Sequence, residues 1–370
     1  MQLAALLRRR LKHQWKLAIL LLTTAVWSGG LVGYGFLFSH LEPTEVSRPQ
    51  GKTEEPDDTA VRSPIKPQAK LSTAPPQRFT TFNQIRHVPA GKFHYSGSPV
   101  WSPIRLGVDS AIRTERREFQ VTDLHRPSQN HRATPFELLK SKKIAFVQAT
   151  HAPEDTIGQG SQASDLQLQQ VPVAYDGIAF AVHPSLPISG LTFHQLAKIY
   201  CGRVTNWKEL GGPDLAIQPI SLQGSADAMV KRFEKDVLKF RPFGHNLRVA
   251  PTTTTAIHHL AATPGGIFFG SAATIVPQCA IKPLAIGRKS DALVPVYQEP
   301  LVPSSRCPKY RNQINISAFQ TQQYPLTQQL SVVFGQPPQS GQPVGQAYAQ
   351  LLLTDQGQTL IKRSGFAPVK

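Results

Sequence analysis

The stretch from Val171 to Gly212 constrains the fold more than any other part of this chain of 370 residues. It reads VPVAYDGIAFAVHPSLPISGLTFHQLAKIYCGRVTNWKELGG. Its first half is rich in β-branched and aromatic residues and predicts a buried strand that ends at the prolines after Val182. Thr192, with Gln195 three residues later, then predicts a capped helix that ends at Gly202. The apolar stripe of this helix consists of Leu196, Ile199 and Tyr200.

Strands and helices alternate along the rest of the chain. Strands are predicted over residues 118–121, 144–149, 217–221, 247–250 and 267–270. Helices are predicted over residues 135–140, over 225–238 and from residue 253 onward. This order favours an α/β protein whose sheets are covered by helices.

The central stretch resembles the phosphate-binding protein family of phosphate ABC importers. In that family a strand written PVAxDGIAVxVNP is followed by LTxxQLxxIYxGKITNWxExGG. The residues that match are Pro172, Val173, Ala174, Asp176, Gly177, Ile178, Ala179, Pro184, Leu191, Thr192, Gln195, Leu196, Ile199, Tyr200, Gly202, Thr205, Asn206, Trp207, Glu209, Gly211 and Gly212. The resemblance extends from about residue 93 to the C-terminus, and within the family the chain resembles the cyanobacterial branch.

The resemblance implies the fold of a type II periplasmic binding protein (PBP). Such a protein has two α/β lobes joined by a two-strand hinge. The folded domain is expected over residues 89–370, with lobe 1 built from 89–175 and 285–370 and lobe 2 from 176–284. Tyr175 and Asp176 fall at the expected crossing, where we expect them to have hinge and packing roles rather than ligand contacts.

The N-terminal region predicts a membrane anchor. Residues 1–16 carry five positive charges and no acidic residue, and residues 17–38 carry no charge. A helix of these 22 residues, rising about 1.5 Å per residue, spans the ~30 Å hydrocarbon core of a bilayer. The basic cluster places the N-terminus in the cytoplasm, so we expect a single-pass protein of the inner (cytoplasmic) membrane with its C-terminal domain in the periplasm. A cleaved signal peptide is the alternative, although its apolar segment is normally shorter.

Residues 39–88 predict a disordered linker. They contain seven prolines, seven basic and six acidic residues, and few large apolar side chains. Such a composition behaves as an extended tether. Eleven of the chain's seventeen surplus positive charges therefore fall in residues 89–370, where they favour an anionic ligand by long-range attraction. A solvated basic surface is the alternative. Nucleic-acid binding is not indicated, since the charges are scattered and no recognition motif accompanies them.

The candidate ligand residues lie in three kinds of place: at predicted helix starts, where unpaired N–H groups favour an oxyanion, directly after the predicted strand 144–149, and in the loop around Ser128. They are Gly97, Ser98, Ser128, Thr150, His151, Gln223, Gly224, Ser225, Ala226, Thr253 and Thr254. The family usually has a threonine at the place of Ala226 and an arginine upstream, near Gln223. It also usually has a glycine-rich loop around Ser128. For Ser98 and for the threonines, simple helix capping is the alternative role.

The resemblance implies capture of phosphate or a similar oxyanion for an ABC permease. Because the ligand residues depart from the family pattern, the alternative is a structural or signalling module that has lost transport-grade binding. No G-x-S-x-G, Walker or H-E-x-x-H motif is present, so we expect neither an enzyme nor a metal or cofactor.

The three cysteines are Cys201, Cys279 and Cys307. An oxidising compartment permits one disulfide and leaves one thiol. Cys279 and Cys307 both lie in proline-flanked, loop-like sequence and are the expected pair. Cys201 falls at a predicted helix end and is expected to be a small buried residue.

Overall fold

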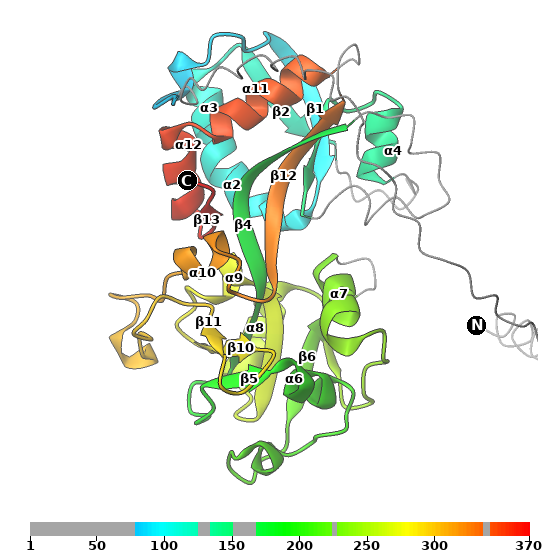
Figure 1. The fold of residues 1–370 in the computed structure, drawn as a ribbon, viewed down its shortest axis with the longest axis vertical. Helices are drawn as coiled ribbons and strands as arrows, with labels where there is room; N and C mark the ends of the chain where they lie inside the picture. The colour runs from blue at the N-terminus through cyan, green and yellow to red at the C-terminus, as the bar shows by residue number, and fades with distance from the viewer. Residues whose placement is uncertain (1–77, 125–133, 151–167, 224–227, 336–340) are drawn as a thin grey trace, which may run out of the picture. The chain divides into compact units, whose positions relative to one another are not determined.

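The described residues belong to one compact unit in which a long strand runs through two sheets. The computed structural model describes residues 78–124, 134–150, 168–223, 228–335 and 341–370. Strand β4 (Leu168–Val182) pairs with β12 (Thr327–Gly335) in the first sheet and with β8 (Gly266–Ser271) in the second. Figure 1 shows β4 and β12 side by side at the connection between the two parts. These strands are the two-strand hinge expected from the sequence.

The first sheet builds lobe 1 and has the strand order β2-β1-β3-β12-β4. Its other strands are β1 (Gly91–Gly97), β2 (Phe119–Asp123) and β3 (Phe146–Ala149), and β1 is parallel to both β2 and β3. The short strand β13 (Ala367–Pro368) pairs with β4. The helical segments of lobe 1 are η1 (Phe82–Gln84), η2 (Pro99–Trp101), α2 (Ser102–Ile104), η3 (Arg105–Asp109), α3 (Ser110–Glu115), α4 (Pro135–Lys140), α11 (Gln342–Leu352) and α12 (Asp355–Arg363).

The second sheet builds lobe 2. Along it, β4 is followed by β8, β6 (Gln218–Leu222) and β7 (Arg248–Ala250), and β9 (Lys282–Pro283) also pairs with β4. A small separate sheet consists of β5 (Gly190–Thr192), β10 (Ala285–Gly287) and β11 (Val294–Pro295). The helical segments are α6 (Phe193–Tyr200), η5 (Trp207–Leu210), α7 (Ala228–Phe233), η6 (Glu234–Leu238), α8 (Thr253–Ala261), α9 (Ala272–Ile275), η7 (Ser304–Arg306) and α10 (Ile316–Gln320).

The helix predicted from Thr192 forms as expected. The Thr192 hydroxyl accepts from the Gln195 backbone N–H at 3.2 Å, and the Gln195 side chain accepts from the Thr192 N–H at 2.8 Å. Two helix-start donors are thereby satisfied. The predicted stripe is buried, and Trp207 beyond it donates from its indole to the Gly265 carbonyl at 3.0 Å.

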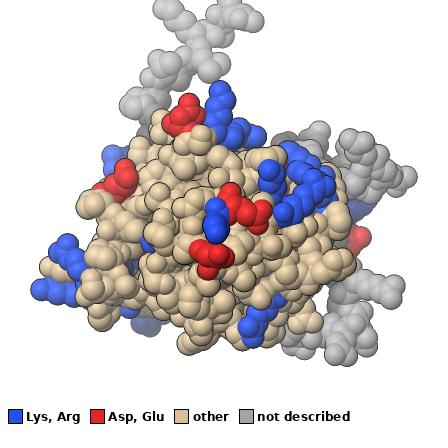
Figure 2. Space-filling model, turned by 90° about the horizontal axis from the view of Figure 1, so that it is seen from below, with Lys and Arg blue, Asp and Glu red and all other residues tan. Residues whose placement is uncertain are grey.

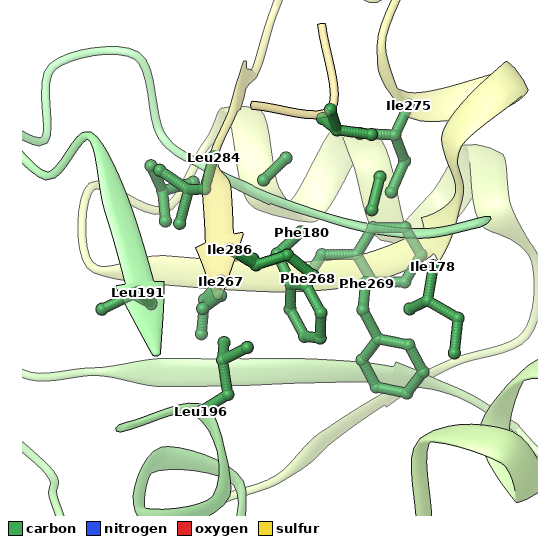
Figure 3. Close-up of a cluster of buried hydrophobic side chains, with 14 of the residues drawn as sticks. Ile178, Phe180, Leu191, Leu196, Ile267, Phe268, Phe269, Ile275, Leu284 and Ile286 are labelled. Atoms are coloured by element: carbon green, nitrogen blue, oxygen red, sulfur yellow. The ribbon is translucent and has the colours of Figure 1, made fainter. Parts of the chain in front are cut away.

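Each lobe has its own core. In lobe 2 the sheet residues Phe180, Phe268 and Phe269 are fully or nearly fully buried, and Figure 3 shows them beside Leu196 of α6. In lobe 1 the rings of Phe146, Tyr95 and Tyr348 pack together: the centroid of Phe146 lies 5.2 Å from that of Tyr95 and 4.5 Å from that of Tyr348, and the two tyrosine centroids are 6.5 Å apart. Aromatic stacking of this kind adds to the burial of apolar area.

Two predicted boundaries differ from the structure. The linker was expected to reach residue 88, but Phe82 and Ile85 are buried in the core of lobe 1. Lobe 1 was expected to resume at residue 285, but β10 pairs with β5 and the core of lobe 2 continues to Leu326. The return to lobe 1 is therefore β12. Two apolar residues inside a proline-rich stretch were too few for the composition to mark them as core.

The predicted anchor, residues 17–38, lies outside the described residues. Among the described helices, none has both the length and the apolar character needed to cross a membrane.

Candidate functional site

The lobe 1 candidates meet at one edge of its sheet. Strands β1 and β3 are parallel neighbours, with Gly97 opposite Gln148, so Ser98 and Thr150 both follow strands that end at this edge. Ligands of open α/β sheets lie beyond such carboxyl ends. The Ser98 N–H donates to the Gln148 carbonyl at 3.0 Å, and its hydroxyl accepts from the Val100 N–H at 3.3 Å. Ser98 thus caps the helical segment that begins at Pro99.

Gly97 has a clear packing reason to be glycine. A Cβ atom placed there would lie 2.3 Å from the Gln148 carbonyl oxygen, which is backbone and cannot move aside easily. The close approach of β1 to β3 therefore requires glycine at this point. The resemblance pointed to a ligand role for Gly97, whereas the geometry shows first that it lets two strand ends converge.

The lobe 2 candidates that the structure describes also share a sheet edge. Strands β6 and β7 are parallel, with Leu222 opposite Ala250, and the Gln223 N–H donates to the Ala250 carbonyl at 2.9 Å. Thr252 caps α8 by accepting from the Thr255 N–H at 3.1 Å. Thr253 and Thr254 form the first turn of α8, where the N–H groups lack partners within the helix.

The structure therefore brings the described candidates into two groups. One contains Gly97, Ser98 and Thr150 on lobe 1, and the other contains Gln223, Thr253 and Thr254 on lobe 2. The remaining candidates, Ser128, His151, Gly224, Ser225 and Ala226, lie outside the described residues.

Arg105 was not among the sequence candidates, yet it organises the edge of lobe 1. Its guanidinium donates to the Gln148 side chain at 2.6 Å and to the Ser98 carbonyl at 3.3 Å. It also forms an ion pair with Asp123, at the end of β2, at 2.7 Å. One side chain thereby ties together the ends of all three parallel strands. A lone arginine outside any motif gave no signal of this role in the sequence.

Behind Arg105 lies a buried polar network. The Tyr348 hydroxyl accepts from the Gln148 amide at 2.8 Å and donates to Asp109 at 2.7 Å, and the Tyr95 hydroxyl donates to the same carboxyl at 3.4 Å. Burial raises the pKa of Asp109 to about 7, although the hydrogen bond from Tyr348 and the charge of Arg105 oppose the rise. Burial and the neighbouring Asp109 raise the pKa of Tyr348. Desolvation thus favours the uncharged, protonated form of the Asp109 carboxyl.

Asp176 has the packing role expected at the crossing of β4. Its carboxylate accepts from the Ser271 hydroxyl at 2.7 Å and from the Ala273 N–H at 3.1 Å. The Gln328 amide of β12 donates to it at 3.4 Å. Asp176 therefore links β4, α9 and the second hinge strand. Burial raises its pKa.

The structure joins Cys279 and Cys307 by a disulfide, which is the pair expected from the sequence, and leaves Cys201 as a half-buried free thiol. A small cavity of about 130 Å³ lies beside this disulfide, and its lining includes Lys282 and Asn312. Its lining residues belong to neither of the two groups of candidate ligand residues. Within the described residues, no three His, Cys, Asp or Glu side chains are grouped to hold a metal ion.

Comparison with known proteins decides the family. The family model of the PBP superfamily domain matches residues 136–356, which is more than half of the chain. The chain belongs to the PBP superfamily. Within the superfamily it is PstS-like: the phosphate-binding protein PstS of Pseudomonas aeruginosa is 26% identical over 211 residues, which cover 54% of this chain and 59% of that protein. The chain thus spans less than two thirds of that relative.

Solved structures agree on the PBP fold. A Clostridium perfringens protein described as a phosphate ABC transporter substrate-binding protein, solved with bound phosphate, has a TM-score of 0.57 at 18% identity and covers 76% of this chain and all of that one. An ABC-type phosphate transport receptor from Vibrio cholerae has a TM-score of 0.56 at 17% identity, over 74% of this chain and 98% of its own. At these identities the likeness shows the fold alone.

Proposed function

We propose that this PBP-superfamily protein captures a small oxyanion, with phosphate as the best candidate, and delivers it to an ABC permease. The observation that carries the proposal is the placement of one polar group of residues at the carboxyl edge of each lobe's parallel strands. On lobe 2 this group lies at the start of α8. Helix-start amides and hydroxyls are the groups that bind oxyanions in proteins.

Arg105 adds a positive charge to the lobe 1 group. Three acceptors hold its guanidinium in place, namely Ser98, Gln148 and Asp123. A guanidinium carries five N–H donors in a fixed plane, so the donors that these three do not use remain available to an anion. In this proposal Arg105 supplies the charge that the replaced residues near Gln223 do not.

The hinge gives the proposed capture its conformational step. Two strands, β4 and β12, join the lobes, and a ligand that contacts both lobes stabilises the closed arrangement relative to the open one. The closed form is the one that an ABC permease would recognise. In this proposal the predicted N-terminal anchor holds the domain on the periplasmic side of the inner membrane.

Calorimetry tests the proposal. Residues 72–370, which form the compact unit, are titrated with inorganic phosphate and separately with sulfate. We expect phosphate to bind with micromolar or tighter affinity and the double variant Thr253→Ala/Thr254→Ala to weaken it at least tenfold. Thr114→Ala, an exposed helical threonine of lobe 1, is the matched control. Absence of binding heat for every oxyanion overturns the proposal and leaves the structural or signalling module.

A further inference from the structure

Phe240 is the most unusual exposed residue among those that the structure describes. Its side chain is 78% exposed. Its φ is +58°, and the preceding residue, Lys239, has a φ of +53°. Left-handed backbone is unfavourable for residues with a Cβ, and it is a genuine outlier for a bulky side chain. Two such residues in succession hold an aromatic ring in water.

The local structure explains why this conformation persists. The N–H groups of Lys239 and Phe240 both donate to the Glu234 carbonyl, the second at 2.9 Å. Arg241 bonds the Leu238 carbonyl through its backbone N–H at 3.2 Å and through its guanidinium at 2.9 Å. Leu238 itself is fully buried. Hydrogen bonds before and after Phe240 thus hold the backbone of the turn in place, and the Phe240 ring is exposed to solvent. Strain that the surroundings hold in place is a feature of functional sites.

The segment that carries the ring is basic. Lys231 lies in α7, Lys235 in η6 and Lys239 directly after η6, and Lys239 and Arg241 are the immediate neighbours of Phe240 in the chain. The segment also contains two acidic residues, Glu234 and Asp236, and Asp236 forms an ion pair with Arg232 at 3.1 Å. Figure 2 shows a group of Lys and Arg side chains to the right of the centre of the face that it draws.

We propose that the turn at Phe240, together with Lys231, Lys239 and Arg241, is a docking surface for an anionic lipid bilayer. An exposed aromatic ring among lysines and arginines is the pattern of segments that lie in the membrane interface, where the ring enters the headgroup region and the cations face anionic lipids. The proposal is independent of oxyanion binding, because none of these residues belongs to the two ligand groups.

A lipid surface fits this patch better than a protein partner does. A stable protein interface buries about 800 Å² on each side around a core of several apolar residues. The other large apolar side chains exposed in the described residues are Leu106, Val249 and Tyr310. Leu106 belongs to lobe 1, and Tyr310 lies under the cations of Arg306 and Lys309. Contact with the interface of a lipid bilayer needs less apolar area, and one aromatic side chain with neighbouring cations is sufficient for it.

The expected membrane anchor is a second reason to propose a lipid bilayer as the partner of this surface. The charge-free stretch 17–38 is expected to lie in a membrane and to hold the domain through a linker. A tether converts weak docking into an intramolecular event with a high effective concentration. The surface would then orient the tethered domain on the bilayer, although it would bind lipid only weakly by itself.

Vesicle binding tests the surface without the tether. Residues 72–370 are mixed with vesicles of phosphatidylglycerol and phosphatidylcholine, and with vesicles of phosphatidylcholine alone, and bound protein is measured by sedimentation. We expect binding to the anionic vesicles that high salt removes. Phe240→Ala should weaken it by roughly tenfold. Lys231→Glu/Lys239→Glu should weaken it by roughly thirty-fold or more, since each cation near an anionic surface contributes several-fold.

The controls are matched in exposure and charge. Leu106→Ala removes a side chain that is also 78% exposed. Lys142→Glu/Lys143→Glu makes the same charge change on lobe 1, and Lys142 also has a positive φ, +57°. Neither control should alter binding, and near-UV circular dichroism checks that all variants fold. Absence of binding to the anionic vesicles overturns the proposal, and equal losses in the controls overturn it too, because binding would then depend on the net charge of the domain alone.

Discussion

The Tyr348 hydroxyl lies 2.7 Å from the Asp109 carboxylate, and this hydrogen bond joins α11 to η3 in the core of lobe 1. The two residues are 239 positions apart in the chain. Through Gln148 the same hydroxyl reaches Arg105 and the strand ends where the lobe 1 candidates lie. The stability of this lobe and the shape of its candidate site therefore depend on one polar network.

The substitution Tyr348→Phe tests this network. It removes the donor to Asp109 and the acceptor of the Gln148 amide, and a buried polar group without a partner costs about 1–3 kcal/mol. We expect urea denaturation to show a loss of about this size. Tyr310→Phe, at a tyrosine that is 46% exposed, should change stability by less than about 0.5 kcal/mol. Equal effects of the two substitutions would contradict the role of the hydroxyl.

Asp109 should make stability depend on pH. Burial raises the pKa of this carboxyl from 3.8 to about 7 in the folded protein. Between these two values the folded state keeps a proton that the unfolded state has lost, so the contribution of Asp109 to stability decreases as the pH rises from about 4 to about 7 and is constant above that.

The matched variant is Asp109→Asn, which removes the titration and keeps a polar side chain of the same shape. The free energy of unfolding is measured at about pH 5 and about pH 8 in both proteins. We expect the natural chain to lose more stability than the variant between these two values. If the free energies of unfolding of the two proteins change equally with pH, the carboxyl of Asp109 does not change its protonation state in this range.

The strained turn at Phe240 should be relieved by glycine. Left-handed backbone costs a residue with a Cβ about 1–2 kcal/mol, and glycine adopts it freely. Phe240→Gly should therefore stabilise lobe 2 by about 1 kcal/mol in thermal or urea unfolding. Leu106→Gly, at an equally exposed position inside a helical segment, should instead destabilise by about 1 kcal/mol. A loss of stability at Phe240 would mean that its ring packs against the protein.

The disulfide should stabilise lobe 2. It joins Cys279 to Cys307 across a separation of 28 residues, and a bridge over such a loop stabilises a protein by about 3 kcal/mol. Cys279→Ala/Cys307→Ala should lower the free energy of unfolding by about this amount, and the variant should become insensitive to reductant. Cys201→Ala is the control: this variant should keep the response to reductant of the natural chain. If reductant leaves the stability of the natural chain unchanged, the bridge does not form in solution.

Local signals made part of this molecule predictable from its sequence. The cap of α6 uses Thr192 and Gln195, three residues apart, and its stripe recurs at helical spacing, so the sequence itself contains the pattern. The helix start at Ser98 was also predicted, and Ser98 caps the segment that begins at Pro99. The network of Arg105, Gln148 and Tyr348 has no such periodicity, because its members meet only when three distant segments pack. The lobe boundary near Leu326 escaped prediction for the same reason, since long-range pairing decides it.

The residues at 223 and 226 offer the sharpest test of where an anion binds. Gln223 lies at the carboxyl end of β6, and its N–H is bonded to the end of β7, so its position beside α8 is fixed. An arginine there could form charge-assisted bonds to an oxyanion, each contributing about 1.5–3 kcal/mol. Gln223→Arg/Ala226→Thr should therefore raise phosphate affinity by about tenfold or more in calorimetry. Gln120→Arg adds the same charge at an exposed position of β2 and should leave affinity nearly unchanged. If both variants raise affinity equally, the gain comes from net charge, and the anion does not bind at the edge of β6 and β7.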